Sequence, residues 1–431
     1  MTRALYTLLL WLALPVLILR LAIRAAKNKA YRDRWAERFG GGATGTPCDL
    51  WVHAVSVGEV NAATPLIRQL LQSHPALRII VTTMTPTGAA RVRDTFGEAV
   101  QHRYAPYDYP LAIRRFLNRF QPGVLILMET EIWPNLIAGC ARRGIAVAMA
   151  NVRLSKKSAR GYRLILPLIG EALSHVSVVA AQSDWDKKNM VGLGVNPDKI
   201  HSTGSTKFEI DMPPSVAEVA LAVRRDWGPN RPVIVAGSTH EGEEAILIEA
   251  LQKLIPTYPD LLLVIAPRHP ERFESVAKVI QRAGFRLSQR THEKGALDPG
   301  IHIQLANTMG ELSTLYAAAD IAVVGGSLIP IRGIGGHNIL EPCAVGVPVV
   351  FGTNMGNFVE ITRLTLAEKA GFQVGNEIQL LHILKQLLED ASLRASVGEN
   401  GRSFIQRNLG ATNRTLSLIY PLLKTASERN K

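Results

Sequence analysis

The sequence predicts an α/β protein made of two similar halves, each a parallel sheet covered by helices, behind an N-terminal membrane anchor helix. Three observations support this fold class. From residue 50 onward, short apolar runs alternate with longer amphipathic ones. The alternation stops at 211–215, where DMPPS brings two prolines, and it restarts at 232–236. Residues 4–19 carry no charge at all. A chain of 431 residues is long enough for two domains with sizeable cores.

The N-terminal segment ALYTLLLWLALPVLIL (4–19) predicts the anchor. As a straight helix it would be about 24 Å long, against a hydrocarbon core of roughly 30 Å. Only Arg3 precedes this run, whereas a cleaved signal peptide usually has its bases before the apolar segment. A membrane anchor, either spanning or lying in the interface, is therefore favoured over a signal peptide or a buried core helix. The bases that follow predict that the chain after Arg20 lies in the cytoplasm.

The charge distribution favours a membrane surface over a nucleic acid as the partner. The formal net charge is +13, and residues 1–40 alone hold eight bases and two acids. Almost half of the excess charge therefore flanks the apolar segment, as expected for contact with an anionic membrane surface. The sequence contains no zinc-finger, RRM or other nucleic-acid signature, so no nucleic-acid partner is expected. Three scattered cysteines (Cys48, Cys140 and Cys343) give neither a disulfide framework nor a zinc spacing, which fits a reducing compartment.

The apolar runs barely alternate, which is typical of strands buried on both faces of a parallel sheet. In the first half we expect strands at 51–55, 78–83, 124–128, 146–150 and 176–181, with helices such as 62–71 and 109–120. In the second half we expect strands at 232–236, 261–266, 286–288, 302–305, 321–324 and 348–351, with helices such as 216–225, 243–254 and 272–283. A last amphipathic stretch from 380 to 425 closes the chain. Ligands of open α/β sheets bind at the carboxyl ends of strands, so the residues just after each strand are the candidates for function.

In the first half, Glu59 follows the first expected strand at a helix start, in SVGE. From spacing alone, a carboxylate that complements the helix dipole is favoured there, with a general base as the alternative. Glu129 and Glu131 follow the third strand, and proximity would raise the pKa of one of them. Lys207, near the junction of the halves, is either a surface charge or a functional one.

Two further segments of the first half have more than one interpretation. TTMTPTG (82–88) could bind an anion through hydroxyls and a helix start, or simply form a capped turn. The pair Asp184 and Asp186 forms a D-x-D, which some transferases use for a divalent cation. Ser183 fits better as a helix N-cap with Asp186 at the third helical position, so we expect no metal site there.

In the second half, Arg268 follows a strand in PRHPER and could clamp a phosphate bidentately, or pair with Glu271. Two glycine clusters, 325–326 and 335–336, lead to Asn338 and Glu341 at a helix start. Glycines let backbone amides approach a phosphate, and Glu341 could accept both hydroxyls of a ribose. Neither G-x-G-x-x-G nor a Walker A motif is present, so a standard dinucleotide or NTPase site is not expected.

Several long motifs occur in the same order as in a known family. The chain resembles the 3-deoxy-D-manno-octulosonic acid (Kdo) transferases of lipopolysaccharide assembly from the anchor to about residue 420. One departure is the segment LIPIRGI (328–334), which is longer than the usual connection in that family. The motifs that carry the resemblance are YRDRWAERFG (31–40), HAVSVGE (53–59), TTMTPTG (82–88), METEIWPN (128–135), PRHPERF (267–273), TMGEL (308–312), GGS (325–327) and GGHNILEP (335–342).

The resemblance implies a GT-B fold, in which two Rossmann-like domains face each other across a cleft. It implies an anchor with its basic flank at 1–30, an acceptor-binding domain at 31–212 and a CMP-Kdo-binding domain at 213–431, whose last helix can pack back on the first domain. It also implies an inverting, metal-independent and cofactor-free transfer of Kdo from CMP-Kdo to a lipid A precursor of the lipid IVA type. The location implied is the cytoplasmic face of the inner membrane.

The resemblance also assigns roles to individual residues. Glu59 matches the general base, and Glu129 and Lys207 match residues that stabilise the transition state. The residues that match the CMP contacts are Pro267, Arg268, Met309, Gly310, Glu311, Asn338, Ile339, Leu340 and Glu341. Two alternatives remain: another GT-B enzyme, for example one using UDP-N-acetylglucosamine, and a membrane-tethered binding module without catalysis.

Overall fold

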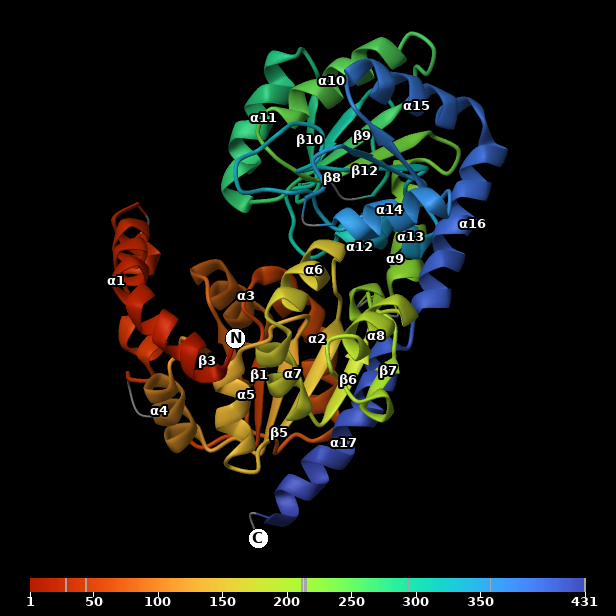
Figure 1. Cartoon of the computed structure of the whole chain (residues 1–431). Helices are drawn as coiled ribbons and strands as arrows, with labels where there is room; N and C mark the ends of the chain where they lie inside the picture. The colour runs from red at the N-terminus through yellow and green to blue at the C-terminus, as the bar shows by residue number, and fades with distance from the viewer. Residues whose placement is uncertain are drawn as a thin grey trace. The chain divides into compact units, whose positions relative to one another are not determined.

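The computed structural model describes residues 1–27, 29–42, 45–210, 212, 215–292, 295–356 and 358–429 (Figure 1). The chain forms two compact units, one of Met1–Glu209 with Leu409–Lys431, the other of Ile210–Asn408. The second unit is thus inserted into the chain of the first. Most of the expected junction at 211–215 lies outside the described residues.

The first unit is built on a sheet of seven parallel strands in the order β3-β2-β1-β4-β5-β6-β7. Trp51 of β1 is paired with Ile80 of β2 on one side and with Leu125 of β4 on the other. All residues of β1, β2 and β4 are buried, as expected for strands covered on both faces. The strands are β1 (Leu50–His53), β2 (Ile79–Thr83), β3 (Gln101–Tyr104), β4 (Val124–Met128), β5 (Ala146–Val152), β6 (Val178–Ala181) and β7 (Ile200–Ser202).

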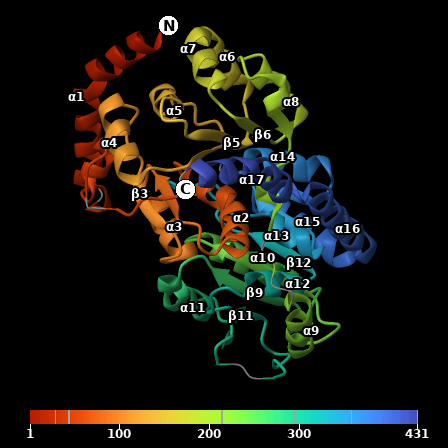
Figure 2. The same cartoon turned by 90° about the horizontal axis from the view of Figure 1, so that it is seen from below.

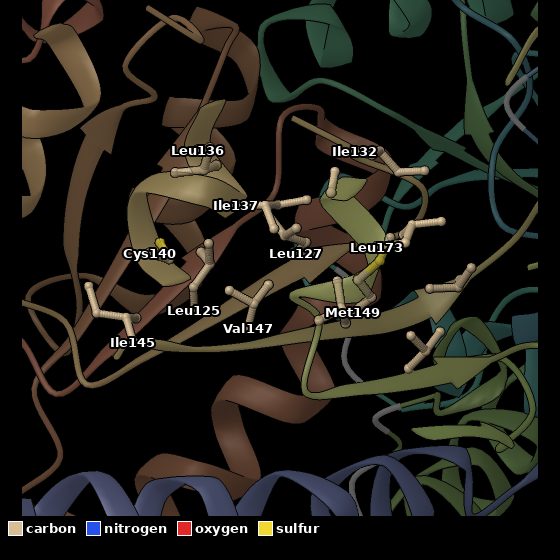
Figure 3. Close-up of a cluster of buried hydrophobic side chains, with 14 of the residues drawn as sticks. Leu125, Leu127, Ile132, Leu136, Ile137, Cys140, Ile145, Val147, Met149 and Leu173 are labelled. Carbon is tan, nitrogen blue, oxygen red and sulfur yellow. The ribbon is translucent and has the colours of Figure 1, made fainter. Parts of the chain in front are cut away.

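Helices cover both faces of this sheet. On one face, α4, α5 and α7 pack on β4 and β5 through a cluster that includes Leu125, Leu127, Leu136, Ile137 and Met149 (Figure 3). On the other face, α2, α3 and α17 pack on the same strands through a second cluster. The helices of this unit after residue 50 are α2 (Val57–Ser73), α3 (Pro86–Phe96), α4 (Pro110–Phe120), α5 (Pro134–Ala141), α6 (Lys156–Leu164), α7 (Leu166–Ser174), α8 (Asp184–Val191) and α17 (Ala411–Arg429), with 3-10 turns η3 (Pro197–Lys199) and η4 (Thr206–Phe208).

The last helix, α17, belongs to the first unit although 199 residues of the second unit precede it in the chain. Leu416 and Ile419 are fully or almost fully buried in the cluster formed with Ile67 of α2 and Ile126 of β4. Arg414 Nε also donates to the carbonyl of Thr203 over 2.8 Å. The α17 helix is therefore part of the core of the first unit.

The second unit has the same plan, with seven parallel strands in the order β10-β11-β9-β8-β12-β13-β14. One face of its sheet is covered by α10, α11 and α15. The strands are β8 (Val233–Thr239), β9 (Leu262–Pro267), β10 (Leu287–Gln289), β11 (Ile303–Leu305), β12 (Ile321–Val324), β13 (Val349–Gly352) and β14 (Gly371–Val374). The helices are α9 (Val216–Trp227), α10 (Glu243–Leu254), η5 (Pro270–Arg272), α11 (Phe273–Arg282), α12 (Leu312–Ala317), α13 (Leu340–Val345), α14 (Val359–Ala367), α15 (Glu377–Glu389) and α16 (Ala391–Asn408).

The apolar N-terminal segment forms one long helix, α1 (Arg3–Lys27), followed by η1 (Lys29–Tyr31) and η2 (Trp35–Phe39). Its stretch Arg3–Ala26 is long and apolar enough to cross a membrane, with a mean hydropathy of 2.1 in its most apolar part. Both views place α1 beside α4 (Figures 1 and 2). A long apolar helix is therefore present where the anchor was expected.

Three strands, β3, β7 and β14, were not among those expected from the sequence. Each one either is short or contains polar residues, as in QHRY of β3 and IHS of β7. Two of them are edges of the first sheet and β14 is an edge of the second. An edge strand is covered less completely, so it lacks the continuous apolar run by which the central strands can be recognised.

Candidate active site

The order of the strands identifies one point in each sheet where a ligand is expected. In the first sheet the chain winds outward from β1 in one direction and from β4 in the other, so the reversal lies between β1 and β4. In the second sheet it lies between β8 and β12. Ligands of doubly wound sheets bind beyond the carboxyl ends of the strands at such reversals. Glu59 follows β1 and Glu129 follows β4, so the first reversal is flanked by two carboxylates.

Glu59 lies in the first turn of α2 and is buried, with a relative exposure of 6%. Its Oε2 accepts from the amide of Val55 over 2.8 Å, and its Oε1 accepts from the Ser56 hydroxyl over 2.9 Å. Ser56 in turn caps the helix by accepting from the Glu59 amide over 3.3 Å. The arrangement is a variant of the capping box, in which the carboxylate accepts from the Val55 amide instead of the N-cap amide. These hydrogen bonds support the interpretation that Glu59 helps to cap the helix.

Burial also gives Glu59 an unusual proton affinity. Removal from water, reinforced by the charges of Glu131 and Glu129, raises its pKa from 4.5 to about 8, although the Val55 amide and the Ser56 hydroxyl oppose the shift. Burial raises the pKa of Glu131 as well, while a 2.6 Å hydrogen bond from Trp133 Nε1 opposes this. The three carboxylates therefore form one electrostatic cluster at the reversal point.

Glu129 is held in this cluster by its backbone and by an ion pair. Its φ of 54° lies in the left-handed region, which is uncommon outside glycine, asparagine and aspartate. Its amide nevertheless donates to the Ala150 carbonyl over 2.8 Å, so neighbouring strands fix the conformation. The Lys207 ammonium lies 2.6 Å from Glu129 Oε1. The structure thus brings together Glu59, Glu129 and Lys207 although they come from three distant parts of the sequence.

Lys207 is positioned by a residue that the sequence analysis did not single out, Asn151. This fully buried asparagine at the end of β5 has a φ of 56°. Its Oδ1 accepts from the Ser205 hydroxyl over 3.2 Å and from the Thr206 amide over 3.1 Å. The available signal was an asparagine directly after an apolar run, a residue type that tolerates the left-handed conformation.

The D-x-D of α8 is occupied by structural hydrogen bonds. Ser183 caps the helix by accepting from the Asp186 amide over 3.2 Å, as expected. Asp186 Oδ1 accepts from the Leu154 amide over 2.8 Å, and Asp184 Oδ1 accepts from the Ser202 hydroxyl over 2.5 Å. TTMTPTG likewise contains a capped turn, in which the Thr85 hydroxyl accepts from the Gly88 amide over 3.1 Å.

In the second unit, the reversal point is organised by Glu243, a fully buried carboxylate. It accepts hydrogen bonds from four backbone amides, those of His240, Gly326, Ser327 and Leu328, over 2.7–3.0 Å. Burial raises its pKa while the four donors oppose the shift. At Gly325 an added Cβ would lie 2.6 Å from the Ser238 carbonyl oxygen, so only glycine allows the two strand ends to approach this closely. The sequence analysis did not single out Glu243.

Arg268 extends from the end of β9 and is exposed. The alternative of a pair with Glu271 is not realised, because the nearest ion pair of Glu271 is with His269 at 4.0 Å. Within the described part of the chain, no side chain forms an ion pair or hydrogen bond with the Arg268 guanidinium. The positive charge of Arg268 helps to lower the pKa of His337 to about 3, after burial as the main cause. The guanidinium is thus available for an anion.

The other expected nucleotide contacts lie at the starts of two neighbouring short helices, α12 and α13. Asn338 Nδ2 donates to Glu341 Oε1 over 3.2 Å, and Asn338 Oδ1 accepts from the Leu340 amide over 3.1 Å. Ile339 and Leu340 are fully buried, so of these two only the backbone is available to a ligand. Glu311 is engaged by Arg290 Nε over 2.8 Å, and Met309 beside it is exposed.

The arrangement can therefore perform proton transfer in one unit and bind an anion in the other. A carboxylate with a pKa near neutrality can accept a proton at physiological pH. The neighbouring lysine can compensate negative charge, and the exposed arginine can bind a phosphate.

Comparison with known proteins identifies the family. Residues 33–210 match the family of 3-deoxy-D-manno-octulosonic-acid transferases, and residues 233–404 match the glycosyl transferases of group 1. The chain is 39% identical over 428 residues to the 3-deoxy-D-manno-octulosonic acid transferase of Haemophilus influenzae, covering 98% of this chain and 99% of that one. It is 37% identical to the enzyme of the same name from Bordetella pertussis, covering 97% of this chain and 99% of that one.

Among solved structures, the chain resembles a UDP-GlcNAc 2-epimerase from Neisseria meningitidis, with a TM-score of 0.52. The identity is 15%, and the likeness covers 86% of this chain and 99% of that chain, so it shows the shared GT-B-like fold alone. The family is shown by the two family matches and by 37–39% identity to named transferases over nearly the full length of the chain. The chain belongs to the 3-deoxy-D-manno-octulosonic acid transferases, glycosyltransferases of lipopolysaccharide biosynthesis.

Proposed function

We propose that this enzyme transfers Kdo from CMP-Kdo to a lipid A precursor of the lipid IVA type, by an inverting and metal-independent displacement. The single observation that carries the mechanism is the cluster of Glu59, Glu129 and Lys207 at the reversal point of the first sheet. The first unit takes the acceptor, and the second unit takes the donor nucleotide. The reaction takes place at the cytoplasmic face of the inner membrane, to which α1 anchors the protein.

In this mechanism Glu59 is the general base. An acceptor sugar hydroxyl is a weak nucleophile at neutral pH, so its proton must leave as the oxygen attacks the anomeric carbon of Kdo. The proton passes to the Glu59 carboxylate. The bond from the anomeric carbon to the phosphate oxygen breaks, and the electron pair leaves with CMP. Attack from the face opposite to CMP inverts the configuration at that carbon.

The other residues of the cluster act on charge rather than on the proton. Glu129 and Lys207, held as an ion pair at 2.6 Å, stabilise the transition state. Arg268 binds the phosphate of CMP and stabilises the negative charge that develops on it. The backbone around Met309–Glu311 and Asn338–Glu341 orients the nucleotide, and Glu341 accepts from the ribose hydroxyls.

The test is incubation of the full-length protein in detergent with CMP-Kdo and lipid IVA, followed by mass spectrometry of the lipid. A mass gain of one or more Kdo residues is the expected result. UDP-N-acetylglucosamine in place of CMP-Kdo is the control donor and should give no product. A product with UDP-N-acetylglucosamine alone would contradict the assignment of the donor.

Metal removal tests the mechanism separately. Because Asp184 and Asp186 are engaged by Ser202, Ser183 and Leu154, EDTA should leave the rate unchanged. A clear loss of rate that added Mg²⁺ restores would contradict a metal-independent transfer.

A further inference from the structure

The N-terminal helix makes polar contacts with the first unit at its very beginning. Tyr6 Oη donates to Asp108 Oδ2 over 2.9 Å, and Thr7 Oγ1 donates to Asn135 Oδ1 over 3.1 Å. Arg3 is paired with Glu171 of α7 at 3.5 Å. The first two turns of α1 are therefore fixed on the side of the membrane where the first unit lies.

The partner of Tyr6, Asp108, also stabilises the first turn of α5. Its carboxylate also accepts from the amides of Asn135 over 3.1 Å and Leu136 over 2.7 Å, which are the first turn of α5. Asp108 is buried, with a relative exposure of 9%. Withdrawal of Tyr6 into a bilayer would remove one of the partners of a buried carboxylate, which is costly.

The middle and the carboxyl end of α1 contact the same unit. Tyr109 Oη donates to the Leu10 carbonyl over 2.7 Å. The Tyr109 ring also packs edge-on against the Trp11 ring, with 5.0 Å between the ring centroids. Near the end of the helix, Leu21 and Ala25 are buried, with relative exposures of 4% and 7%. The less exposed residues of α1 recur every three or four positions, so they form one face along the whole helix. They are Arg3, Tyr6, Thr7, Leu10, Leu14, Leu17, Leu21 and Ala25.

A helix that crosses a bilayer has its two ends on opposite sides of about 30 Å of hydrocarbon. Here both ends contact one folded unit. The opposite face of α1 is strongly apolar and exposed, which is typical of a helix lying in the membrane interface. That face includes Leu5, Leu8, Leu9, Leu12, Val16, Leu19 and Ile23.

A basic pocket has a lining that begins at Pro110, the residue after Tyr109. It has a volume of about 300 Å³ and lies between α4 and α5, lined by Pro110, Leu111, Ile113, Arg114, Gly139, Arg142 and Arg143. None of these lining residues, all from the described part of the chain, is a carboxylate. Arg143 donates to Asn118 Oδ1 over 2.7 Å, whereas Arg114 and Arg142 are exposed and have no ion pair within the described residues. Leu111, which lines the pocket, is itself an exposed apolar side chain.

We propose that α1 lies in the plane of the cytoplasmic leaflet without crossing it, and that the arginine pocket beside it binds a phosphate headgroup of an anionic lipid. The proposal rests on the membrane location in the proposed function, but not on the transfer reaction. The leaflet is chosen as the partner because an exposed apolar helix face and unpaired arginines complement its acyl chains and its phosphates respectively.

Sidedness of the helix start is tested by thiol labelling of Thr2→Cys in the full-length protein. The native cysteines Cys48, Cys140 and Cys343 are buried, and the parent protein gives their background. A membrane-impermeant maleimide should label Thr2→Cys in inverted inner-membrane vesicles but not in spheroplasts. Ala26→Cys, at the other end of α1, is the matched control and should behave identically. Labelling of Thr2→Cys in spheroplasts, or its failure to react in inverted vesicles, would overturn the in-plane orientation.

The pocket is tested by flotation of the full-length protein with vesicles of phosphatidylcholine, with or without phosphatidylglycerol. Replacing both Arg114 and Arg142 by Gln should lower the affinity for the anionic vesicles about fivefold per arginine. The control pair Arg225→Gln and Arg282→Gln, two exposed arginines of the second unit, removes the same charge and should have little effect. Equal losses in both pairs would overturn the pocket assignment.

Free phosphate separates a lipid site from a general anion site. Inorganic phosphate should not displace the protein from anionic vesicles at equal ionic strength, because seating on the leaflet also needs the apolar face of α1. Displacement by phosphate, but not by chloride of the same ionic strength, would contradict the lipid headgroup as the ligand. Neither vesicle experiment involves CMP-Kdo, so a failure of either would not be confused with a failure of the proposed transfer.

Discussion

Glu59 combines two roles that looked like alternatives in the sequence. Its carboxylate helps to cap α2 through Ser56 and Val55, yet burial, reinforced by the charges of Glu131 and Glu129, raises its pKa to about 8. The capping contacts hold the carboxylate in place, and the burial supplies the proton affinity that a base needs near neutral pH. A helix cap and a catalytic base are therefore compatible in one side chain.

We predict that Glu59→Gln lowers turnover on the order of 10²–10⁴-fold, the usual contribution of general base catalysis. A carboxylate must be ionised to act as a base, and a raised pKa shifts its ionisation to higher pH. The activity of the parent enzyme should therefore rise with pH up to about 8. Steady-state rates between pH 5 and 9 measure this rising limb of the pH–rate profile, which should disappear in Glu59→Gln.

Glu129→Gln is the matched control for Glu59→Gln. It should slow turnover by weakening the ion pair with Lys207, but the rise of activity with pH should remain. Near-normal turnover in Glu59→Gln, with loss of the limb in Glu129→Gln, would transfer the role of base to Glu129.

Arg268 should contribute to nucleotide affinity and little to folding, because its guanidinium is exposed. We predict that Arg268→Ala weakens CMP binding by about 1.5–3 kcal/mol, the range of a charge-assisted hydrogen bond. Calorimetric titration with CMP measures this. Arg225→Ala, an exposed arginine on α9, is the control, and equal affinity in the parent and Arg268→Ala would refute the contact.

At the scale of elements, the two sheets differ in the residues that follow the strands at the reversal point. In the first unit, charged side chains follow β1 and β4. In the second unit, Glu243 gathers the backbone that follows β8 and β12 by accepting four amide hydrogen bonds. The Gly326–Leu328 turn thereby gains a fixed shape without secondary structure of its own.

We predict that Glu243→Gln lowers the free energy of unfolding by about 1–3 kcal/mol. An amide oxygen can replace only one of the two carboxylate oxygens as acceptor, which leaves buried N–H groups without partners. Chemical denaturation followed by circular dichroism measures the change. Glu249→Gln, on the exposed side of the same helix in an i,i+4 pair with Lys253, is the control and should cost well under 1 kcal/mol.

The sequence was sufficient for the central strands and for most of the candidate site. Strands such as β4 and β12 are continuous apolar runs. Glu129 and Arg268 directly follow such runs, and Glu59 lies four positions after the expected strand at 51–55. The edge strand β3, QHRY, could not be recognised because its exposed side requires polar residues. Asn151 was missed because its role depends on Ser205 and Thr206, more than 50 positions away, which no local pattern reveals.

At the scale of the whole molecule, the core of the first unit includes a helix from the far end of the chain. Leu416 of α17 is fully buried against α2 and the strands of that unit. We predict that Leu416→Ala costs about 2–5 kcal/mol of stability, the usual range for a buried leucine in a core.

The loss should destabilise the first unit selectively. Limited proteolysis of Leu416→Ala should therefore release fragments from within Met1–Glu209 earlier than from within Ile210–Asn408. Leu418→Ala, one position from Ile419 on a less buried part of the same helix, is the control. Equal protection of the first unit in the parent and Leu416→Ala would show that α17 is not part of its core.

The insertion of one unit into the chain of the other also imposes an order on biosynthesis. Residues 1–209 leave the ribosome first, but the core that they form remains incomplete until α17 has emerged. At about 5–20 residues per second, roughly 200 intervening residues delay completion by about 10–40 seconds. Throughout that interval the nascent chain already exposes α1, the most apolar segment. Delivery of the nascent chain to the bilayer can therefore precede folding of the domain that carries the proposed catalytic base.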